Sequence, residues 1–360
     1  MIEQDGAISP ENTIFVLLCF EGPDVYSTAG GLGTRVTELS EALAQQGYTT
    51  HLIFIGAPDK PNVETRVDGR LILKRWSQWI SKYYPNGVYD GEEQKLYDFN
   101  ESIPYHIYNE IVRPAQAEGK TVVIMGEDWH TSEAICRTSD LLNWFGMRQK
   151  VLIMWNLNSL MSLYQRWIMA VEAVARLKHS GHPVTLFVRG GIEPHGAEVL
   201  RHAYQMGLSI RDIVARRPNL KQCIDAVAKA GPADIYNMRF FLPEEFVRTT
   251  YAAADATLAN SGHEPFGLVG LEVMAAQGIA VTGSTGEDYA VSFENTIVTE
   301  TDDPDEIVGY LLYLRRHPEE QERIRTAGRQ TAEQFLWDQV IENLVGKLEF
   351  LARKQGIPLK

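Results

Sequence analysis

The amino-acid sequence predicts an α/β protein built from two doubly wound parallel sheets. A buried apolar run over 14–20 is followed by a glycine-rich turn, by an amphipathic helix that stops at Gly47, and by a second apolar run over 51–55. This strand, helix and strand unit has the length that a right-handed parallel crossover needs. The alternation begins again at Trp167, and 360 residues correspond to roughly two domains of about 150 residues each. Two such sheets with a cleft between them are the most economical architecture.

The remaining elements of the first half follow from apolar runs. Strand character returns over 121–125 and over 150–154, with a helix between them. Residues 60–118 are rich in aromatic residues and turns. We expect these rings to pack long surface connections, and stacking on a ligand is the alternative.

The second half repeats the pattern. An amphipathic helix is expected over 167–178, and helical segments are expected between 189 and 255. Strands are expected over 183–188, 256–259 and 279–281. From about Glu319 the chain is expected to be helical, with Phe335-Leu-Trp337 interrupting the helix before a last amphipathic segment.

Composition and charge exclude several classes of protein. The chain has 34 Lys and Arg against 47 Asp and Glu, a net charge of −13 that disfavours binding to nucleic acid. Its longest apolar runs are far shorter than the roughly 20 residues of a membrane span, and the polar start over 1–13 lacks the pattern of a signal peptide. Cys19, Cys136 and Cys223 have no paired spacing, which is typical of reduced thiols. We therefore expect a cytoplasmic protein without an integral membrane segment.

A glycine cluster lies between the first strand and the first helix. It contains Gly30, Gly31 and Gly33, which allow the backbone to approach a ligand closely. The helix start offers N–H groups and a positive dipole end to an anion or a sugar oxygen. Because Val36 stands where the dinucleotide-binding fingerprint has its third glycine, a nicotinamide cofactor is disfavoured. The alternative is a tight turn that binds no ligand.

A histidine follows another predicted strand, in the stretch Gly126–Thr131. His130 can donate a hydrogen bond to a sugar hydroxyl, and the neighbouring Asp128 can fix its orientation. A purely structural hydrogen-bonding histidine is the alternative.

The third motif spans Ala259–Glu272, where a strand end, an irregular turn with Pro265 and Gly267, and a helix from about Leu268 follow one another. The helix N-terminus suits a diphosphate, and the carboxylates of Glu264 and Glu272 suit sugar and ribose hydroxyls. A solvated pair of glutamates is the alternative. The sequence contains no Ser/His/Asp nucleophile signature, no phosphate loop of the Gly-x4-Gly-Lys type and no metal-binding helix, so we expect neither a cofactor nor a metal.

These three motifs, in this order, resemble retaining glycosyltransferases of the GT-B fold, the group that includes glycogen and starch synthases and sucrose synthase. Residues 30–33 resemble the glycine loop of that group, and 128–131 resemble the histidine motif of the synthases. Residues 263–272 resemble the Glu-x7-Glu donor motif. The segment from Phe335 resembles the C-terminal helix that crosses back to the first domain.

The resemblance implies a fold, a reaction and a set of site residues. Two Rossmann-like domains would face each other across a cleft, with an acceptor-side domain over 1–164, a nucleotide-sugar domain over 165–336 and a returning helix over 337–360. A hexose would pass from a nucleotide diphosphate sugar, which is a co-substrate, to a hydroxyl of a glycan or small molecule, with retention of the anomeric configuration. The leaving phosphate would help to deprotonate the acceptor, and catalysis would come mostly from positioning and charge stabilisation.

The implied roles fall into three groups. Glu264 would hold the sugar hydroxyls and His130 would contact the hexose, and these two residues form the catalytic group. The donor would be bound by Gly31, Phe266, Gly267, Leu268 and Glu272. Gly30, Gly33 and Asp128 would line the acceptor side of the cleft.

The sequence departs from the group at three places, one of which is Trp155-Asn156, where the group has a His-Asn pair. Thr28 stands where glycogen synthases have a lysine, which argues against α-glucan elongation, although that activity remains an alternative. Between Asn158 and Trp167 the chain lacks the length for a linker, the first strand of the second domain, and the Arg and Lys that neutralise the leaving diphosphate. Arg166 is a candidate remnant and Arg189 a candidate substitute. A second sheet without that strand would have a hole at its centre.

Three functions therefore stay open. A retaining glycosyltransferase is the first. A non-catalytic relative that binds sugar nucleotides or glycans would follow from the loss of the Arg and Lys. A sugar-nucleotide epimerase or an inverting transferase of similar fold is the third.

Overall fold

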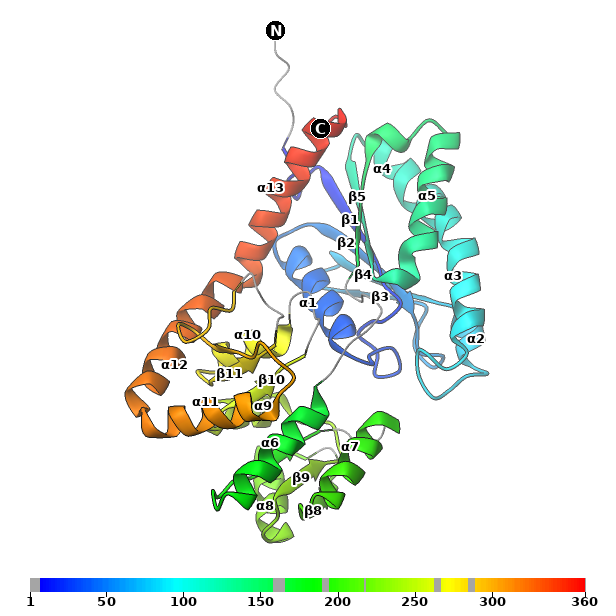
Figure 1. The fold of residues 1–360 in the computed structure, drawn as a ribbon. Coiled ribbons are helices and arrows are strands. Elements are labelled where there is room, and N and C mark those ends of the chain that lie inside the picture. The colour runs from blue at the N-terminus through cyan, green and yellow to red at the C-terminus, as the bar shows by residue number, and fades with distance from the viewer. Residues whose placement is uncertain are drawn as a thin grey trace. The chain divides into compact units, whose positions relative to one another are not determined.

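The computed structural model describes residues 7–157, 166–189, 194–216, 218–261, 267–283 and 289–359. The chain divides into two compact units. Unit 1 consists of Met1–Ser159 and Phe335–Lys360, and unit 2 consists of Leu160–Gln334. Both are α/β units with parallel sheets (Figure 1). The two doubly wound, Rossmann-like halves expected from the sequence are thus present, and the predicted boundary at 164/165 lies outside the described residues.

Unit 1 is built on one six-stranded sheet with the order β3-β4-β2-β1-β5-β6. Its strands are β1 (Thr13–Leu18), β2 (Thr49–Ile55), β3 (Val63–Arg66), β4 (Leu71–Trp76), β5 (Thr121–Glu127) and β6 (Val151–Asn156). All neighbours are parallel except the edge pair β3 and β4. The register pairs Leu17 of β1 with Leu52 and with Met125. Such an order reverses direction beside β1, and the carboxyl ends of strands at this switch point are where sheets of this kind bind ligands.

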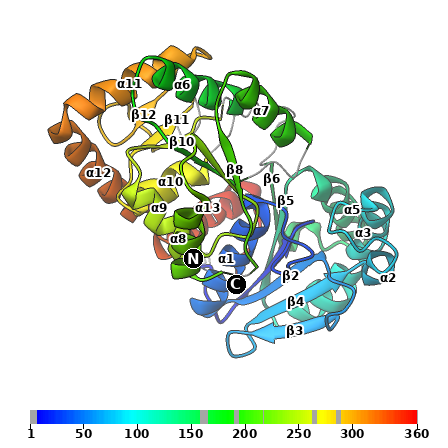
Figure 2. The same ribbon diagram turned by 90° about the horizontal axis from the view of Figure 1, so that it is seen from below.

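Helices cover both faces of this sheet (Figure 2). The helical segments of unit 1 are α1 (Gly31–Gln45), α2 (Gln78–Ser81), α3 (Glu92–His106), η1 (Ile107–Val112), α4 (Arg113–Ala117), η2 (Trp129–Thr131), α5 (Ser132–Trp144), η3 (Arg148–Lys150), η4 (Glu333–Phe335, shared with unit 2) and α13 (Trp337–Gln355). Successive strand residues point to opposite faces, so Leu17 packs with α1 and α13 while Val16 packs with α3 and α5.

The C-terminal helix α13 belongs to unit 1. Ile341, Leu348 and Ala352 are buried in the same core cluster as Leu43 of α1. Trp337 Nε1 also donates a hydrogen bond of 3.3 Å to Glu38. The last helix therefore completes the core of the unit in which the chain begins.

Unit 2 contains two separate three-stranded sheets. One has the order β7-β9-β8 and the other the order β10-β11-β12, with all neighbours parallel. The strands are β7 (Leu186–Val188), β8 (Ile210–Ile213), β9 (Ile235–Met238), β10 (Thr257–Ala259), β11 (Ala280–Thr282) and β12 (Ile297–Val298). The helices are α6 (Trp167–His179), α7 (Pro194–Gln205), α8 (Leu220–Ala230), α9 (Glu244–Ala253), α10 (Leu268–Ala275), α11 (Pro304–Arg316) and α12 (Pro318–Ala332).

Helix α6 joins the two halves of unit 2. Its Val171 and Val174 pack with Leu186 of β7, and its Met169 and Ala173 pack with Leu258 of β10. Among the described residues, no helix is long and apolar enough to cross a membrane.

Two expectations about local structure were wrong. Residues 189–255 contain the strands β8 and β9 as well as helices, because these strands are only four residues long and their apolar runs are interrupted by polar residues. Residues 60–118 are not merely surface connections, since they form the β3–β4 pair and helices α2 and α3. Several rings of this region are nevertheless exposed, among them Trp79, Tyr83 and Tyr97.

Candidate functional site

The glycine loop of unit 1 is organised around a buried carboxylate. Glu21 follows β1 and is only 4% exposed. Its Oε2 accepts hydrogen bonds from the backbone N–H groups of Ala29 (3.0 Å), Gly30 (3.0 Å) and Gly33 (3.1 Å). The sequence predicted that this helix start offers open N–H groups to a ligand. The amides of Gly30 and Gly33 instead bind the protein's own carboxylate.

The three predicted glycines have different surroundings. A Cβ at Gly33 would lie 2.9 Å from Glu21 Oε2, closer than real Cβ atoms come to other atoms. A Cβ at Gly30 or Gly31 would meet nothing within 4 Å. Gly33 is therefore required for packing, whereas Gly31 borders open space at the first position of α1.

His130 lies in η2, directly after β5, and is 4% exposed. Its ring stacks between Phe20 and Trp129, with centroid distances of 4.4 and 3.7 Å. Its Nε2 lies 2.8 Å from Oε1 of Glu92, the first residue of α3. Because an ionised carboxylate only accepts hydrogen bonds, Nε2 carries the proton. Nδ1 is then an acceptor, and it is buried without a hydrogen-bond partner among the described residues.

Burial lowers the pKa of His130 below its usual value, and the nearby carboxylates of Glu92, Asp128 and Glu21 oppose this shift. The imidazole is therefore neutral at pH 7. Nδ1 of the neutral ring is an acceptor, and because it is buried, a hydroxyl group reaches it only if neighbouring side chains move.

Asp128 has a different role from the one expected. Its carboxylate accepts a hydrogen bond of 2.9 Å from the Trp129 amide, while the His130 ring donates its hydrogen bond to Glu92. Asp128 adopts φ 64° and ψ 173°, a conformation that costs a non-glycine residue about 1–3 kcal/mol. Its amide donates to the Asn156 carbonyl at 2.7 Å. This hydrogen bond to the end of β6 thus helps to hold Asp128 in its strained backbone conformation.

Tyr89 connects the glycine loop with the histidine. Its hydroxyl donates a hydrogen bond of 2.6 Å to Glu21 Oε1, and its ring centroid lies 5.6 Å from that of His130. Burial and the Glu21 carboxylate raise the pKa of Tyr89 well above its usual range. The structure therefore brings together two predicted regions through Glu21, Tyr89 and Glu92, which sequence reasoning missed. Of these three residues, only Glu21 could have been suspected from the sequence, because it directly follows a buried strand.

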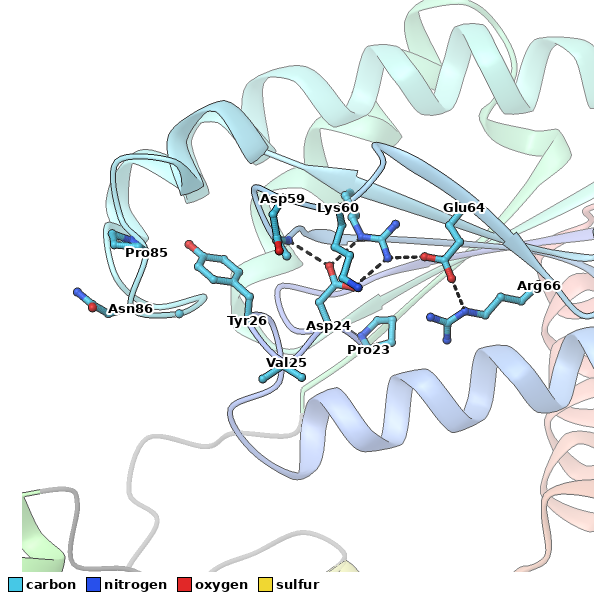
Figure 3. Close-up of a pocket in the computed structure, with 13 residues that line it drawn as sticks. Pro23, Asp24, Val25, Tyr26, Asp59, Lys60, Glu64, Arg66, Pro85 and Asn86 are labelled. Atoms are coloured by element: carbon cyan, nitrogen blue, oxygen red, sulfur yellow. Dashed lines mark hydrogen bonds and ion pairs between the residues drawn. The ribbon is translucent and has the colours of Figure 1, made fainter. Parts of the chain in front are cut away.

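A cavity of about 570 Å³ lies at the carboxyl ends of β1, β2 and β4 in unit 1 (Figure 3). It is lined by charged and polar residues from three loops and two strands, including Asp24, Asp59, Lys60, Glu64, Arg66 and Asn86. Charges of both signs line it. Such a lining favours a neutral polyhydroxy compound over a strongly charged one, because hydroxyl groups both donate and accept hydrogen bonds.

The floor of this cavity is a buried ion-pair network. Arg75, 1% exposed, binds Asp24 with two hydrogen bonds of 2.8 and 2.9 Å and Glu64 with one of 2.6 Å. Asp24 also accepts the Ala57 amide at 3.1 Å. The network therefore ties the loops after β1 and β2 to β3 and β4.

In unit 2, β10 leads to helix α10, as the third motif predicts. Gly267 is the N-cap of α10 with φ 75°, a left-handed conformation that glycine adopts readily. Its carbonyl accepts a hydrogen bond of 2.5 Å from the Tyr289 hydroxyl. A Cβ at Gly270 would lie 2.5 Å from the same hydroxyl, so the first turn of α10 packs tightly on Tyr289.

The donor-binding residues predicted for this motif are partly described. Leu268 begins α10 and Glu272 lies exposed one turn further on. Burial raises the pKa of Tyr251 to about 12, and the charge of Glu272 adds to this shift. Glu264 and Phe266 lie outside the described residues, as does the segment 158–165 in which the sequence lacks a linker and a strand.

Both candidate cations of unit 2 interact with other side chains. Arg166 is paired with Asp302 at 2.7 Å, and its side chain is 10% exposed. The Arg189 guanidinium lies 5.3 Å from the centre of the exposed Phe241 ring. Arg166 is thus a paired cation next to α6, whereas Arg189 makes a cation–π contact with Phe241.

Two α/β units with parallel sheets are the architecture of the GT-B fold. The family model described as "Glycosyl transferases group 1" matches residues 161–331, which is nearly all of unit 2. Sucrose-phosphate synthase from Thermosynechococcus elongatus has a similar structure, with a TM-score of 0.61, 15% identity, and coverage of 95% of this chain and 98% of that one. The catalytic domain of starch synthase IV from Arabidopsis thaliana, bound to ADP and acarbose, gives a TM-score of 0.52, 13% identity, and coverage of 96% and 99%. At these identities the two structures establish the fold.

A curated relative supports the same class. The D-inositol 3-phosphate glycosyltransferase of Thermomonospora curvata is 27% identical over 117 residues. The alignment covers 32% of this chain and 27% of the relative. The chain thus spans about a quarter of the length of this relative.

Proposed function

We propose that this protein is a retaining glycosyltransferase that transfers a hexose from a nucleotide diphosphate sugar to an acceptor hydroxyl. The observation that carries the proposal is the match of residues 161–331 to the group 1 glycosyl transferase family, on the unit in which α10 follows the carboxyl end of β10. The curated relative that aligns with part of this chain is named a glycosyltransferase.

Unit 2 would bind the donor. The first N–H groups of α10 have no partner within the helix and lie at its positive dipole end, which suits a diphosphate. Glu272, exposed on the same helix, would accept hydrogen bonds from the ribose hydroxyls. From the sequence motif alone, Glu264 would hold the sugar hydroxyls and the backbone at Phe266 would contact the sugar.

Unit 1 would bind the hexose and the acceptor. From the sequence motif alone, His130 would contact the hexose, and because its Nδ1 is buried, that contact would require the neighbouring side chains to move. Gly31 would allow close approach of the backbone. The cavity above Arg75, with its balanced charges, would take a glycan or another polyhydroxy acceptor. Orientation and stabilisation of the leaving diphosphate would supply most of the rate enhancement.

The test is release of nucleoside diphosphate from UDP-, ADP- and GDP-sugars, with and without sugar acceptors. We expect Glu272→Ala to raise the KM for the donor about tenfold or more, equivalent to about 1.4 kcal/mol of lost binding. Glu322→Ala, an exposed glutamate on α12, is the matched control and should leave the KM unchanged. The anomeric configuration of the product, measured by NMR, tests retention.

Other results would contradict the proposal. Interconversion of donor sugars without acceptor would indicate an epimerase, and an inverted product would exclude the retaining mechanism. Binding of a donor without any release would indicate a non-catalytic relative.

A further inference from the structure

Unit 2 contains a cavity of about 830 Å³ that touches the end strands of both its sheets. The residues lining it include Leu186 and Phe187 of β7 and Leu258 of β10. β7 ends the order β7-β9-β8, and β10 ends the order β10-β11-β12. Among the described residues, no strand pairs with the outer edge of either one. The cavity therefore lies where two half-sheets fail to join.

The backbone of both strands presents hydrogen-bonding groups to this cavity. Leu186 donates its N–H to the Asp234 carbonyl at 2.8 Å, on the β9 side. Thr257 donates its N–H to the Ile279 carbonyl at 2.8 Å, on the β11 side. Because neighbouring residues of a strand direct their main-chain groups to opposite edges, Phe187 and Leu258 direct theirs to the open edges. Exposed strand edges of this kind readily accept a further strand.

Apolar side chains from helices line the rest of the cavity. They come from α6, α8, α9 and α11, and include Val174, Leu177, Ile224, Val227, Phe246 and Leu311. Phe187 and Ile224 are 43% and 50% exposed, which leaves large apolar surfaces uncovered. An occupant must therefore combine an extended backbone with apolar side chains.

The volume suits one short strand. Since a strand rises about 3.3 Å per residue, neighbouring strands lie about 4.8 Å apart and stacked layers about 10 Å apart, each residue of a buried strand occupies about 160 Å³. The cavity of about 830 Å³ then holds about five residues.

We propose that this cavity binds an extended apolar peptide segment of another polypeptide, which pairs with β7 on one side and with β10 on the other. The added strand joins the two three-stranded sheets into one seven-stranded sheet. Main-chain hydrogen bonds at Phe187 and Leu258 hold its backbone, and the helix side chains select branched apolar residues. A small apolar molecule satisfies the side chains but not the two backbone edges.

The experiment uses the full chain and a capped peptide, acetyl-Lys-Val-Ile-Val-Val-Ile-Lys-amide, as the probe. Hydrogen exchange is measured by NMR at the amides of Phe187 and Leu258. We expect saturating peptide to slow exchange at both amides at least tenfold. In the same peptide N-methylated at its five central residues, these residues have no N–H to donate and the methyl groups keep the backbone away from both strands, so this peptide should have no such effect. Unchanged exchange, or equal protection by the methylated peptide, would overturn the proposal.

A pair of variants on α8 locates the binding site. Ala228 lines the cavity, whereas the adjacent Lys229 is exposed outside it. Ala228→Trp should weaken peptide binding at least tenfold, and Lys229→Trp should leave it unchanged. Equal effects of the two variants would refute the site. Slow exchange at Phe187 and Leu258 without peptide would also refute it, and sedimentation would then show whether a second copy of the chain covers the cavity.

Discussion

The backbone N–H of Gly33 donates a hydrogen bond of 3.1 Å to Oε2 of Glu21, so a carboxylate of the protein occupies the start of helix α1. The same oxygen accepts the amides of Ala29 and Gly30. A negative charge is favourable at this end of a helix, which explains why a buried Glu is tolerated here. The loop is therefore shaped by the protein itself before any ligand arrives.

Substitution of Gly33 and Gly31 should show which glycine is needed for packing and which only borders open space. Gly33→Ala should lower the free energy of unfolding by about 1–3 kcal/mol, because its Cβ would displace the Glu21 carboxylate. Gly31→Ala is the matched control, and it should be neutral or stabilising by up to about 1 kcal/mol, because its Cβ meets nothing within 4 Å. Urea unfolding measures both changes.

The same Gly31→Ala variant tests the donor-binding role of this residue. If the sugar nucleotide approaches the Gly31 backbone, the variant should lose activity while it keeps its stability. Full activity in Gly31→Ala would contradict that role, and equal destabilisation by the two variants would contradict the packing argument.

Replacement of Glu92 should change the titration of His130. The Glu92 carboxylate raises the pKa of His130 against the lowering effect of burial. Glu92→Gln should therefore lower this pKa further, as measured by NMR titration of the imidazole. Glu93→Gln, an exposed neighbour on α3, should leave it unchanged. An unchanged pKa in Glu92→Gln would show that the ring and this carboxylate do not interact.

Apolar runs in the sequence predict most of the strands that position the residues of the candidate site. The predicted strands at 51–55 and 121–125 correspond to β2 and β5, and the strand at 256–259 corresponds to β10. These strands are long runs of apolar residues or lie next to clear turns. The four-residue strands β8 and β9 were missed because polar residues interrupt their apolar runs.

The contacts within the site were harder to predict for a different reason. Glu92 is 38 residues from His130 in sequence, and Tyr89 is 68 residues from Glu21. Which carboxylate meets which donor depends on how α3 packs on the sheet, and no local pattern encodes that. Asp128, adjacent to His130, was the natural choice from sequence, yet its positive φ turns its carboxylate to the Trp129 amide.

His51 should make the protein less stable in mild acid. Burial, together with the charge of His106, lowers the pKa of His51 in β2 to about 4, from an ordinary value of 6.5. Below pH 6.5 the unfolded chain binds a proton at His51 more readily than the folded chain does. The contribution of neutral His51 to the free energy of unfolding is therefore complete above pH 6.5 and is lost as the pH falls towards 4. The loss amounts to at most about 3 kcal/mol.

Comparison of variants measures the contribution of His51 to the pH dependence of stability. In urea unfolding between pH 7 and pH 4, His51→Gln should show a shallower loss of unfolding free energy than the parent chain. His195→Gln removes an exposed histidine and should keep the parent's slope. Identical slopes for all three proteins would mean that His51 titrates normally.

The buried ion pairs of Arg75 should contribute far more to the free energy of unfolding than the ion pairs of the more exposed Arg66. Arg75→Met leaves the carboxylate of Asp24, itself 4% exposed, without its bidentate partner, and we expect a loss of about 3–5 kcal/mol. Arg66→Met removes an exposed partner of the same Glu64, with a side chain 36% exposed, and should cost less than about 1 kcal/mol. Urea unfolding measures both losses, and the double variant Asp24→Ala with Arg75→Met should lose less than the sum of its single variants. Additive losses, or equal losses for Arg66→Met and Arg75→Met, would show that burial does not strengthen this pair.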